Sequence, residues 1–570
     1  GEGAQAKRRM SAVVLDHVTP PLTQANTHGV MAVIESLMDE YFEAAGMDKN
    51  RSAALLCDIL EQAERAGITT DCGIAKEDAP DEKLLKLDNF LCDLKELQIR
   101  DGLHIFGRNP NIAQTGELLA QILRAPRGDG DGANASLLRA LASDLELTNH
   151  GNNNDDDTNF DPLTAIAGEN WTGPTPLILA RQSTGAWRCN GHTTQRLDKL
   201  ARELINSALG GVLDAIPGPV SRLILTKALK PLKRDLLRCG AQEDAALHWA
   251  LAGRFIAAGP SGAPTRGRPE VLPTGRNFFS IDSRALPTPT AWRLGWASAN
   301  AVIERYLQDY GNWPKALVLT AWGTSNMRTG GDDIAQALAF MGVQPVWDSA
   351  SRRVTGFDVI PLDVLDRPRI DVSLRCSGFF RDAFPAQMSL IDRAVQAVAK
   401  LNEPDDMNPL AAAVRRETAA SEAAGLSFDA ATRRSTLRVF SAKPGTYGAG
   451  LQTLIDEGIW DDRSDFAEAF LVWSSYAYGD GVAGSPARDM LETRLGYADA
   501  VLHNQDNREH DILDSDDYYQ FAGGLSAAVS HISGRDVPIY HNDHSLAEIP
   551  ITRSLAEEIS RVVRGRASNP

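Results

Sequence analysis

The chain has 570 residues, more than one hydrophobic core holds, so we expect three or four domains, each with its own buried interior. A net charge of −17 argues against a protein that binds nucleic acid through the phosphate backbone and favours cations as ligands, although solubility alone explains most surface acids. Six cysteines without a Cys-x-x-Cys spacing exclude a zinc ribbon and a disulfide framework and indicate a reducing compartment. No apolar run approaches the length of a membrane span and no signal segment opens the chain, so we expect a soluble, cytoplasmic protein without membrane partners.

Apolar residues recur at helical spacing through the first part of the chain, for example at Ile34 and Met38. We therefore predict a helical domain over residues 1–150. The run from Asn149 to Asp157 has no apolar side chain to bury, which is typical of a solvated linker. Helical patterns then resume, and residues 151–260 are predicted to form this linker plus a helical region.

Residues 273–288 are predicted to form an ordered loop, because their sequence lacks the repeating apolar face of a helix or a strand. Pro273, Gly275 and Pro287 fix or free the backbone. Four polar side chains place donors and acceptors between aromatic ones: Arg276, Asn277, Asp282 and Arg284. This mixture suits a large, flat ligand with carboxylates or amides, and it equally suits a structural loop whose polar groups satisfy one another.

After residue 260 short apolar runs alternate with helical patterns, which predicts an α/β fold with a mostly parallel sheet. The apolar runs 316–320 and 343–347, with a helical pattern between them, predict a β-α-β unit. We divide this half into an α/β domain over 261–430, which contains the loop 273–288, and a C-terminal α/β region over 431–570. The chain as a whole is predicted to be a helix-rich, multidomain α/β protein whose N-terminal half is helical.

Polar side chains follow four of the predicted strands, and ligands of open α/β sheets bind at the carboxyl ends of the strands. The four loops carry Trp322, Thr324, Asn326 and Arg328; then Ser377 and Arg381; then Tyr447 among glycines; and then His503 to Asp506. No Gly-x-x-x-x-Gly-Lys-Ser/Thr motif is present, so we expect no ATP hydrolysis in this chain.

The densest group of chemically active side chains follows the last of these strands: His503, Asp506, Glu509, His510, Asp511, Asp514, Asp516 and Asp517. Imidazole and carboxylate together suit a divalent transition ion, and a carboxylate also accepts protons. An acidic run is equally typical of a solvated surface, or of a helix N-terminus that Asp514 or Ser515 caps. A weaker second group of candidates is His531, His541 and His544.

Several motifs occur in a fixed order along nearly the whole chain: the loop 273–288, Trp322-Gly323-Thr324, Arg367 to Val372, Cys376-Ser377-Gly378, Phe380-Arg381-Asp382, Glu403-Pro404 and Arg438 to Ser441. In this order they resemble the large subunits of chelatases that insert a metal ion into a tetrapyrrole. That family contains the cobaltochelatase large subunit (CobN-type) of aerobic cobalamin synthesis and its relative from magnesium chelatase, the H subunit. The run Arg328 to Gly331, with the acids after it, looks closer to the cobalt branch.

The resemblance implies the tetrapyrrole-binding subunit of an ATP-dependent cobaltochelatase, a ligase that forms nitrogen-metal bonds. Such a protein binds hydrogenobyrinic acid a,c-diamide and inserts Co²⁺ as the substrate metal. A separate AAA+ ATPase subunit and its companion subunit use ATP and Mg²⁺, which are not expected to bind to this chain.

The resemblance also assigns roles to residues of this sequence. Substrate-binding residues are then Arg276, Asn277, Asp282, Arg284, Trp322, Thr324, Arg328, Ser377, Arg381 and Tyr447. The expected metal ligands are His503, His510, Asp514 and Asp517, and the expected catalytic group is Asp514, His510 and Glu509. A loop around His104 resembles one near the substrate cavity, although a single histidine is more often structural.

Other interpretations stay open: a magnesium chelatase H subunit acting on protoporphyrin IX, a tetrapyrrole carrier that does not chelate, and an assembly module without a ligand. The sequence departs from the family at Asp517, where the family has histidine. The family's His-x-Gly-Thr-His-Gly motif, with its nearby glutamate, lies upstream and is absent from these residues. Because Gly1 falls inside a family motif, we interpret the chain as the C-terminal portion of a longer polypeptide.

Overall fold

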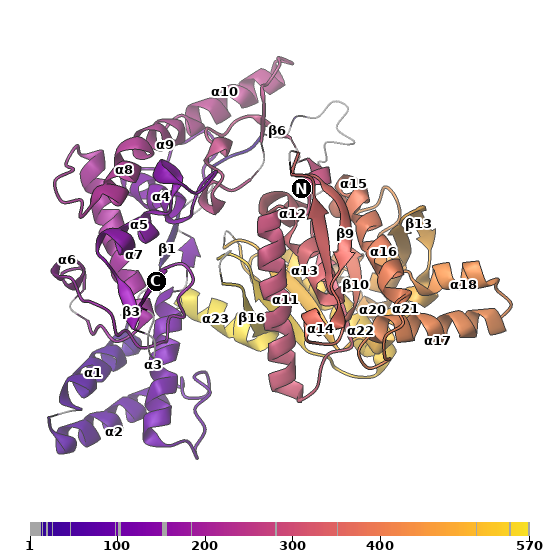
Figure 1. Cartoon of the computed structure of the whole chain (residues 1–570), viewed down its shortest axis with the longest axis horizontal. Helices are drawn as coiled ribbons and strands as arrows, with labels where there is room; N and C mark the ends of the chain where they lie inside the picture. The colour runs from indigo at the N-terminus through magenta and orange to yellow at the C-terminus, as the bar shows by residue number, and fades with distance from the viewer. Residues whose placement is uncertain are drawn as a thin grey trace. The chain divides into compact units, whose positions relative to one another are not determined.

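The computed structural model describes residues 13, 15–18, 21–24, 27–45, 47–96, 98–100, 104–150, 157–183, 185–260, 262–279, 282–349, 351–508, 510–546 and 549–567. These residues form two compact units (Figure 1). The helical unit draws on residues 15–254, 263–276 and 559–570, and the sheet unit on residues 1–14, 255–262 and 277–558. The domain boundaries at residues 150, 260 and 430 stay predictions.

The helical unit confirms the helical character predicted for the first half of the chain. Its helices are α1 (Val30–Ala44), α2 (Lys49–Arg65), α3 (Pro80–Glu96), α4 (Ile112–Arg124), α5 (Leu137–Asp144), α6 (Leu177–Ala180), α7 (Asn190–Leu209), α8 (Pro219–Lys227), α9 (Leu229–Leu236) and α10 (Cys239–Leu251). Short 3-10 turns are η2 (Gly132–Asn134), η3 (Pro264–Arg266) and η4 (Pro269–Val271). Two antiparallel strand pairs accompany them: β1 (Leu22–Gln24) with β2 (Gln98–Arg100), and β3 (Thr148–His150) with β4 (Asp157–Asn159).

Two apolar cores hold the helical unit together. One lies among α1, α2 and α3 and contains Ile34, Ile59 and Leu87, all fully buried. The other contains Leu119 of α4 and Leu197 of α7, also fully buried. Each such side chain contributes about 1.5–3 kcal/mol when water is removed from it, so the apolar spacing seen in the sequence is the main source of this packing.

The sheet unit contains an eight-stranded sheet in the order β13-β12-β11-β10-β7-β14-β15-β16. The strands are β7 (Ala316–Ala321), β10 (Asp371–Cys376), β11 (Val439–Ser441), β12 (Tyr476–Gly479), β13 (Val482–Pro486), β14 (Ala500–Gln505), β15 (Ile539–Asp543) and β16 (Ile551–Ser554). The five central strands, β11, β10, β7, β14 and β15, are mutually parallel. Strands β12 and β13 add an antiparallel edge on one side of the sheet, and β16 adds one on the other side. The mostly parallel sheet expected from the sequence is therefore confirmed.

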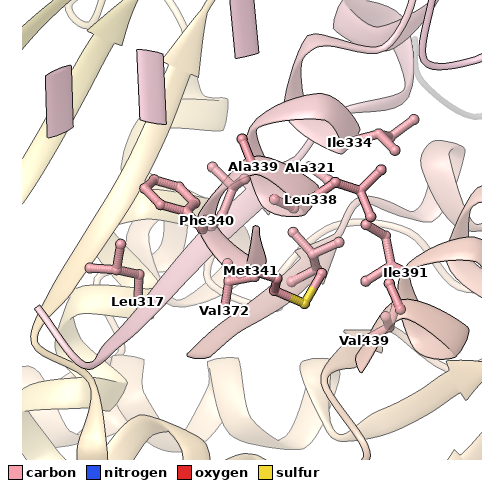
Figure 2. Close-up of a cluster of buried hydrophobic side chains, with 14 of the residues drawn as sticks. Leu317, Ala321, Ile334, Leu338, Ala339, Phe340, Met341, Val372, Ile391 and Val439 are labelled. Carbon is pink, nitrogen blue, oxygen red and sulfur yellow. The ribbon is translucent and has the colours of Figure 1, made fainter. Parts of the chain in front are cut away.

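Helices cover both faces of this sheet, because its central strands are apolar on both sides. Leu317, Leu319 and Ala321 point into a core with α11, α13 and α16, of which Figure 2 shows a part. Val318 belongs to the opposite core, with α20, α21 and α22. The helices are α11 (Pro289–Tyr310), α12 (Gly323–Thr329), α13 (Asp332–Met341), α14 (Leu362–Leu365), α15 (Gly378–Ala383), α16 (Pro385–Ala399), α17 (Pro409–Ala423), α18 (Phe428–Ser435), α19 (Gln452–Glu457), α20 (Arg463–Ser474), α21 (Arg488–Tyr497) and α22 (Gly524–Ser533), with the π-helix η6 (Tyr518–Gly523), the 3-10 turn η5 (Ser283–Ala285) and a last helix α23 (Leu555–Ala567).

The predicted β-α-β unit is wrong in its second strand. The strand β8 (Val343–Trp347) does not join the large sheet; it pairs antiparallel with β9 (Val354–Val359). Pro345 lies within β8, and proline has no N–H to offer a neighbour, so a central position with partners on both sides is unfavourable. A further small pair is parallel, between β5 (Ala258–Pro260) and β6 (Asn277–Phe279). No helix within the described ranges has the length and apolar character needed to cross a membrane.

Candidate functional site

The carboxyl ends of β7 and β14 lie side by side, with Leu319 opposite Leu502. Along the chain the parallel strands run β7, β10, β11, β14, β15, whereas across the sheet their order is β11-β10-β7-β14-β15. The chain therefore leaves β7 toward one edge and returns at β14 to build the other. Ligands of open α/β sheets bind where the strand order reverses in this way, because the loops diverge there.

A pocket of about 50 Å³ opens at this point, and we call it the switch-point pocket. It is lined by Trp322, Thr324, Ser325, Arg328, His503, Asn504, Gln505, Asp506, His510, Asp517 and Tyr518. One water molecule occupies about 30 Å³ in the liquid, so the pocket holds an ion or one or two water-sized groups. It does not enclose a tetrapyrrole ring.

Arg328 and Asp506 connect the two loops that form this pocket. Arg328 Nε donates to Asp506 Oδ2 at 2.8 Å, and Arg328 Nη2 donates to Asp506 Oδ1 at 2.9 Å. Asp506 is 4% exposed, whereas Arg328 is partly open to solvent. The two-pronged geometry fixes the guanidinium plane and uses both carboxylate oxygens, which is the strongest form of such a pair.

Three histidine side chains and one tyrosine side chain lie beside this ion pair. The ring centres of His503 and His541 are 5.0 Å apart, and those of His503 and Tyr518 are 4.8 Å apart. Tyr518 also lies within hydrogen-bond distance of His510, with 3.0 Å between its hydroxyl and Nδ1. His503 and His541 face each other because the parallel register of β14 and β15 pairs these two positions. We call His503, His510, Tyr518 and His541 the imidazole–phenol group.

Burial keeps three members of this group, His503, His510 and Tyr518, uncharged. It lowers the pKa of His503 well below the usual 6.5, and the neighbouring His541 adds to the effect. Burial also lowers the pKa of His510, with Arg328 contributing, and burial raises the pKa of Tyr518. Imidazoles with lowered pKa values are neutral at pH 7, so the ring nitrogens of His503 and His510 are available as proton acceptors or metal ligands.

The acidic residues that the sequence predicted for the site lie in different environments. Asp517 lines the pocket, and burial, with a smaller contribution from Asp516, raises its pKa to about 6. Asp514 is exposed, and its Oδ2 accepts from the backbone N–H of Asp511 at 3.2 Å. The helical turn that leads into η6 begins at Asp516, and Ser515 Oγ caps it by accepting from the backbone N–H of Asp517 at 3.3 Å, so of the two capping residues considered above Ser515 has this role. Glu509 lies outside the described residues.

A buried polar network beneath the pocket was not predicted from the sequence. Asp333 is fully buried, and its Oδ2 accepts from the backbone N–H of Trp322 at 3.1 Å and from Asn326 Nδ2 at 2.6 Å. Its Oδ1 accepts from Asn504 Nδ2 at 2.9 Å, and Asn542 Nδ2 donates to Asn504 Oδ1 at 2.8 Å. Burial raises the pKa of Asp333 to about 6, against the hydrogen bonds that lower it. The network thereby fixes the loops after β7 and β14 relative to each other.

Ser377, Arg381 and Tyr447 form a separate cluster after β10 and β11. Ser377 Oγ caps α15 by accepting from the backbone N–H of Phe380 at 3.2 Å. Arg381 Nη1 donates to the carbonyl oxygens of the 442–446 loop, at 2.8 Å in the case of Thr446. Tyr447 donates its hydroxyl to Asp382 Oδ2 at 2.7 Å, and Arg381 Nε donates to Asp382 Oδ1 at 2.9 Å. Arg381 and Asp382 also border a wider recess of about 470 Å³.

The loop 273–288 passes from the helical unit to the sheet unit between Arg276 and Asn277. Arg276 turns back on its own loop, where Nε donates to the carbonyl of Pro273 at 2.8 Å. In the sheet unit Asp282 pairs with Arg284 at 2.9 Å and with Arg353 at 3.0 Å, and the hydrogen bond from Arg284 is the main cause that lowers its pKa to about 2. The described lining of the switch-point pocket includes none of these side chains.

His104 has a structural environment in the helical unit. Its Nε2 lies 3.0 Å from Oε2 of Glu243, a fully buried carboxylate on α10. The other oxygen, Oε1, accepts from Thr274 Oγ1 at 2.6 Å and from the backbone N–H of Val18 at 2.9 Å. Glu243 therefore attaches the first part of the loop 273–288 to α10.

Of the predicted site residues, the structure brings together Trp322, Thr324, Arg328, His503, His510 and Asp517. Among the described side chains no three His, Cys, Asp or Glu residues are arranged to hold a metal ion. His541 and Asp333 join the site through strand pairing and helix packing, which sequence spacing does not reveal. His544, from the weaker candidate group, is buried beside Ser298, with 2.7 Å between its Nε2 and Ser298 Oγ.

This fold and this arrangement define an open α/β protein with a site at its strand-order reversal, and comparison with known proteins gives the family. The CobN/Magnesium Chelatase family matches residues 1–570. The chain therefore belongs to this family, which confirms the resemblance drawn from the motifs.

The similar proteins include cobaltochelatase and magnesium-chelatase subunits. The chain is 53% identical over 579 residues to the aerobic cobaltochelatase subunit CobN of a Sinorhizobium species, and 50% identical over 570 residues to that of Pseudomonas aeruginosa; both alignments cover 100% of this chain and 45% of the relative. The magnesium-chelatase H subunit of Chlorobaculum parvum is 28% identical over 534 residues, covering 92% of this chain and 40% of the relative. The catalytic subunit of cobaltochelatase from Mycobacterium tuberculosis matches with a TM-score of 0.82 at 37% identity, covering 98% of this chain and 44% of that one. The chain thus spans less than half the length of these relatives.

Proposed function

We propose that this chain is the C-terminal portion of the large subunit of an ATP-dependent cobaltochelatase. In this proposal the complete subunit binds hydrogenobyrinic acid a,c-diamide in the cytoplasm and inserts Co²⁺. A partner AAA+ ATPase subunit and its companion use ATP and Mg²⁺. The observation that carries the proposal is the identity of 53% and 50% to cobaltochelatase subunits over the whole chain, against 28% to a magnesium-chelatase subunit.

The chemistry of the switch-point pocket supports this function. A metal ion that enters a tetrapyrrole displaces protons from the ring nitrogens, so the protein needs nearby groups that accept protons at neutral pH. His503 and His510 are buried and neutral, and Tyr518 connects to His510. His503 Nδ1 has no hydrogen-bond partner in the part of the chain that the structure describes, which leaves this nitrogen available to a ligand.

The size of the pocket supports a division of labour. A volume of about 50 Å³ fits an ion with a water molecule or a relay of protons, while the macrocycle stays outside it. We therefore propose that Co²⁺ or the displaced protons pass through this pocket. Asp517, with a pKa of about 6, then accepts a proton, and the imidazole–phenol group relays protons toward it without keeping them.

An optical titration of the complete polypeptide tests the proposal. Hydrogenobyrinic acid a,c-diamide is added in one series and protoporphyrin IX in a parallel series, each followed by absorbance. A saturable spectral change with the corrin alone is the expected result, and cobalt insertion should follow when the ATPase subunits, ATP and Co²⁺ are supplied. A change with the porphyrin alone favours the magnesium branch. Corrin binding without insertion favours a carrier, and no change with either ring leaves an assembly module.

A further inference from the structure

A second polar pocket lies in the helical unit, remote in sequence from every residue of the switch-point pocket. Its volume is about 170 Å³, and it is enclosed by α1, α3, α7 and the segment that precedes α7. By the share of about 30 Å³ that a water molecule takes in the liquid, it has room for roughly five non-hydrogen atoms. The lining is charged, so the balance between its carboxylates and its cations decides which kind of ligand the pocket can bind.

Three carboxylates in this pocket already have cationic partners. Lys95 Nζ lies 2.7 Å from Glu35 Oε1. Arg188 bridges the other two, with Nη1 at 2.9 Å from Asp39 Oδ1 and Nη2 at 2.8 Å from Asp88 Oδ1. These two cations face three carboxylates, so one unit of negative charge remains in the described lining.

Two further cations on α7 have no such match. Arg196 is 2% exposed; its Nη2 donates to the carbonyl of Gly185 at 2.6 Å, and its guanidinium lies 4.7 Å from the ring centre of Trp187. Its Nε is buried and has no hydrogen-bond partner within the described ranges. Lys199, one helical turn further on, also forms no hydrogen bond or ion pair with any described residue. Residues three apart on a helix lie about 5–6 Å from each other, so the two charges face the same space.

The surroundings of Lys199 show how crowded this positive charge is. Burial lowers the pKa of its ammonium group, and the positive charges of Arg196, Lys95 and Arg202 lower it further. Burial likewise lowers the pKa of Arg196. Arg196 and Lys199 bring the lining to four cations against three carboxylates, and an anion between these two groups balances the excess positive charge.

We propose that this pocket binds a small oxyanion of the phosphate or carboxylate class between Arg196 and Lys199. The open Nε of Arg196 donates one hydrogen bond to the oxyanion, and the ammonium group of Lys199 donates another. Gln195, on the same face of α7 and also in the lining, offers an amide N–H. Charge-assisted bonds of this kind are about twice as strong as neutral ones. The proposal does not depend on the function of the switch-point pocket.

The test is a calorimetric titration of the complete polypeptide with inorganic phosphate, and separately with acetate, in a buffer of low ionic strength. The wild type should bind one equivalent. Lys199→Met should weaken binding about tenfold or more, because it removes one charge-assisted bond while it keeps the length of the side chain. Lys199→Arg, which keeps the charge, should retain most of the affinity. Lys227→Met, at an exposed position of α8, serves as the matched control and should bind like the wild type.

The two anions distinguish the source of the ligand. Tighter binding of phosphate indicates free phosphate or a phosphate ester, and tighter binding of acetate indicates a carboxylate group of a larger molecule. The absence of one-site binding for both anions overturns the proposal. Binding that Lys199→Met leaves unchanged also overturns it. Because neither titration contains a tetrapyrrole, failure here is separate from failure of the proposed cobaltochelatase function.

Discussion

Arg328 and Asp506 are 178 residues apart in the sequence, yet they form a two-pronged ion pair across the strand-order reversal. Arg328 follows β7, and Asp506 follows β14. The pair therefore joins the loop after the first strand of the large sheet to the loop after the strand that begins its other half. Asp506 is buried, and Arg328 is a cation that faces its carboxylate at the edge of the pocket, where Asn507 Nδ2 also donates to Oδ1 at 3.0 Å.

We predict that Arg328→Met lowers the free energy of unfolding by about 2–3 kcal/mol, because it leaves the carboxylate of Asp506 buried without its cation. Urea denaturation followed by circular dichroism measures this change. Arg65→Met is the matched control: its partner Glu61 is exposed, and exposed pairs contribute about 0–1 kcal/mol. Equal losses in the two variants would show that the Arg328–Asp506 pair does not stabilise the site.

The hydroxyl of Tyr518 gives a second prediction. Tyr518→Phe removes the group that lies 3.0 Å from His510 Nδ1 and keeps the aromatic ring. If the imidazole–phenol group relays the displaced protons, cobalt insertion should slow by about ten- to a hundredfold, which is within the range of lost acid–base catalysis. The affinity for the corrin should not change. Tyr519→Phe, at an exposed position next in sequence, is the control and should insert cobalt at the wild-type rate.

The strands of the large sheet are the part of the site that could be predicted from the sequence. The apolar runs predicted the strands that lead to Trp322, Ser377 and His503. Trp322 and Ser377 do follow the carboxyl ends of parallel strands, whereas His503 still lies within β14. The runs predicted these strands because a buried parallel strand needs a continuous apolar run. Pro345 is the signal against the additional strand, because its missing N–H leaves a neighbouring strand without a donor.

The rest of the site depends on relations that have no local signature. His541 faces His503 only because β14 and β15 pair in one register out of several possible ones. Asp333 is one of two adjacent acids at the start of α13, and both are ordinary helix-start residues by sequence. Its role follows from burial and from three donors that converge on it, and these come from residues 322, 326 and 504.

Glu243 gives a third prediction, in the helical unit. Both of its oxygens accept from backbone N–H groups, from Val18 at one oxygen and from Gly107 at the other. Glu243→Gln must therefore turn its amide N–H₂ toward a donor in either orientation, and we expect a loss of about 2 kcal/mol in the free energy of unfolding. Because Thr274 is held through the same side chain, the weakened contact should loosen the loop, and cleavage by trypsin after Arg276 should become faster.

Limited proteolysis with gel analysis measures this change. The control is Glu270→Gln, in the same region but exposed and paired only with Arg268. If both variants are cut at the wild-type rate, Glu243 does not hold the loop.

Asp517 gives a prediction in which stability and function oppose each other. Burial raises the pKa of this carboxyl from 3.8 to about 6, so between about pH 4 and pH 6 the folded protein binds a proton that the unfolded chain has released. The buried carboxylate charge therefore lowers the free energy of unfolding above about pH 6. Below about pH 4 the carboxyl is protonated and this loss of stability is absent.

Asp517→Asn keeps the shape of this side chain and removes its charge. It should raise the free energy of unfolding above pH 6 by about 1–2 kcal/mol, the value of the shift reduced for partial exposure, and change little at pH 4. The same variant should insert cobalt more slowly, because a group that accepts protons or holds the metal is gone. Urea denaturation at pH 4 and pH 8, with Asp461→Asn at an exposed position as the control, measures the first effect, and the insertion assay measures the second. A variant that is more stable at pH 8 and fully active would show that Asp517 is a buried charge without a role in insertion, and a variant with unchanged stability at both pH values would contradict the raised pKa.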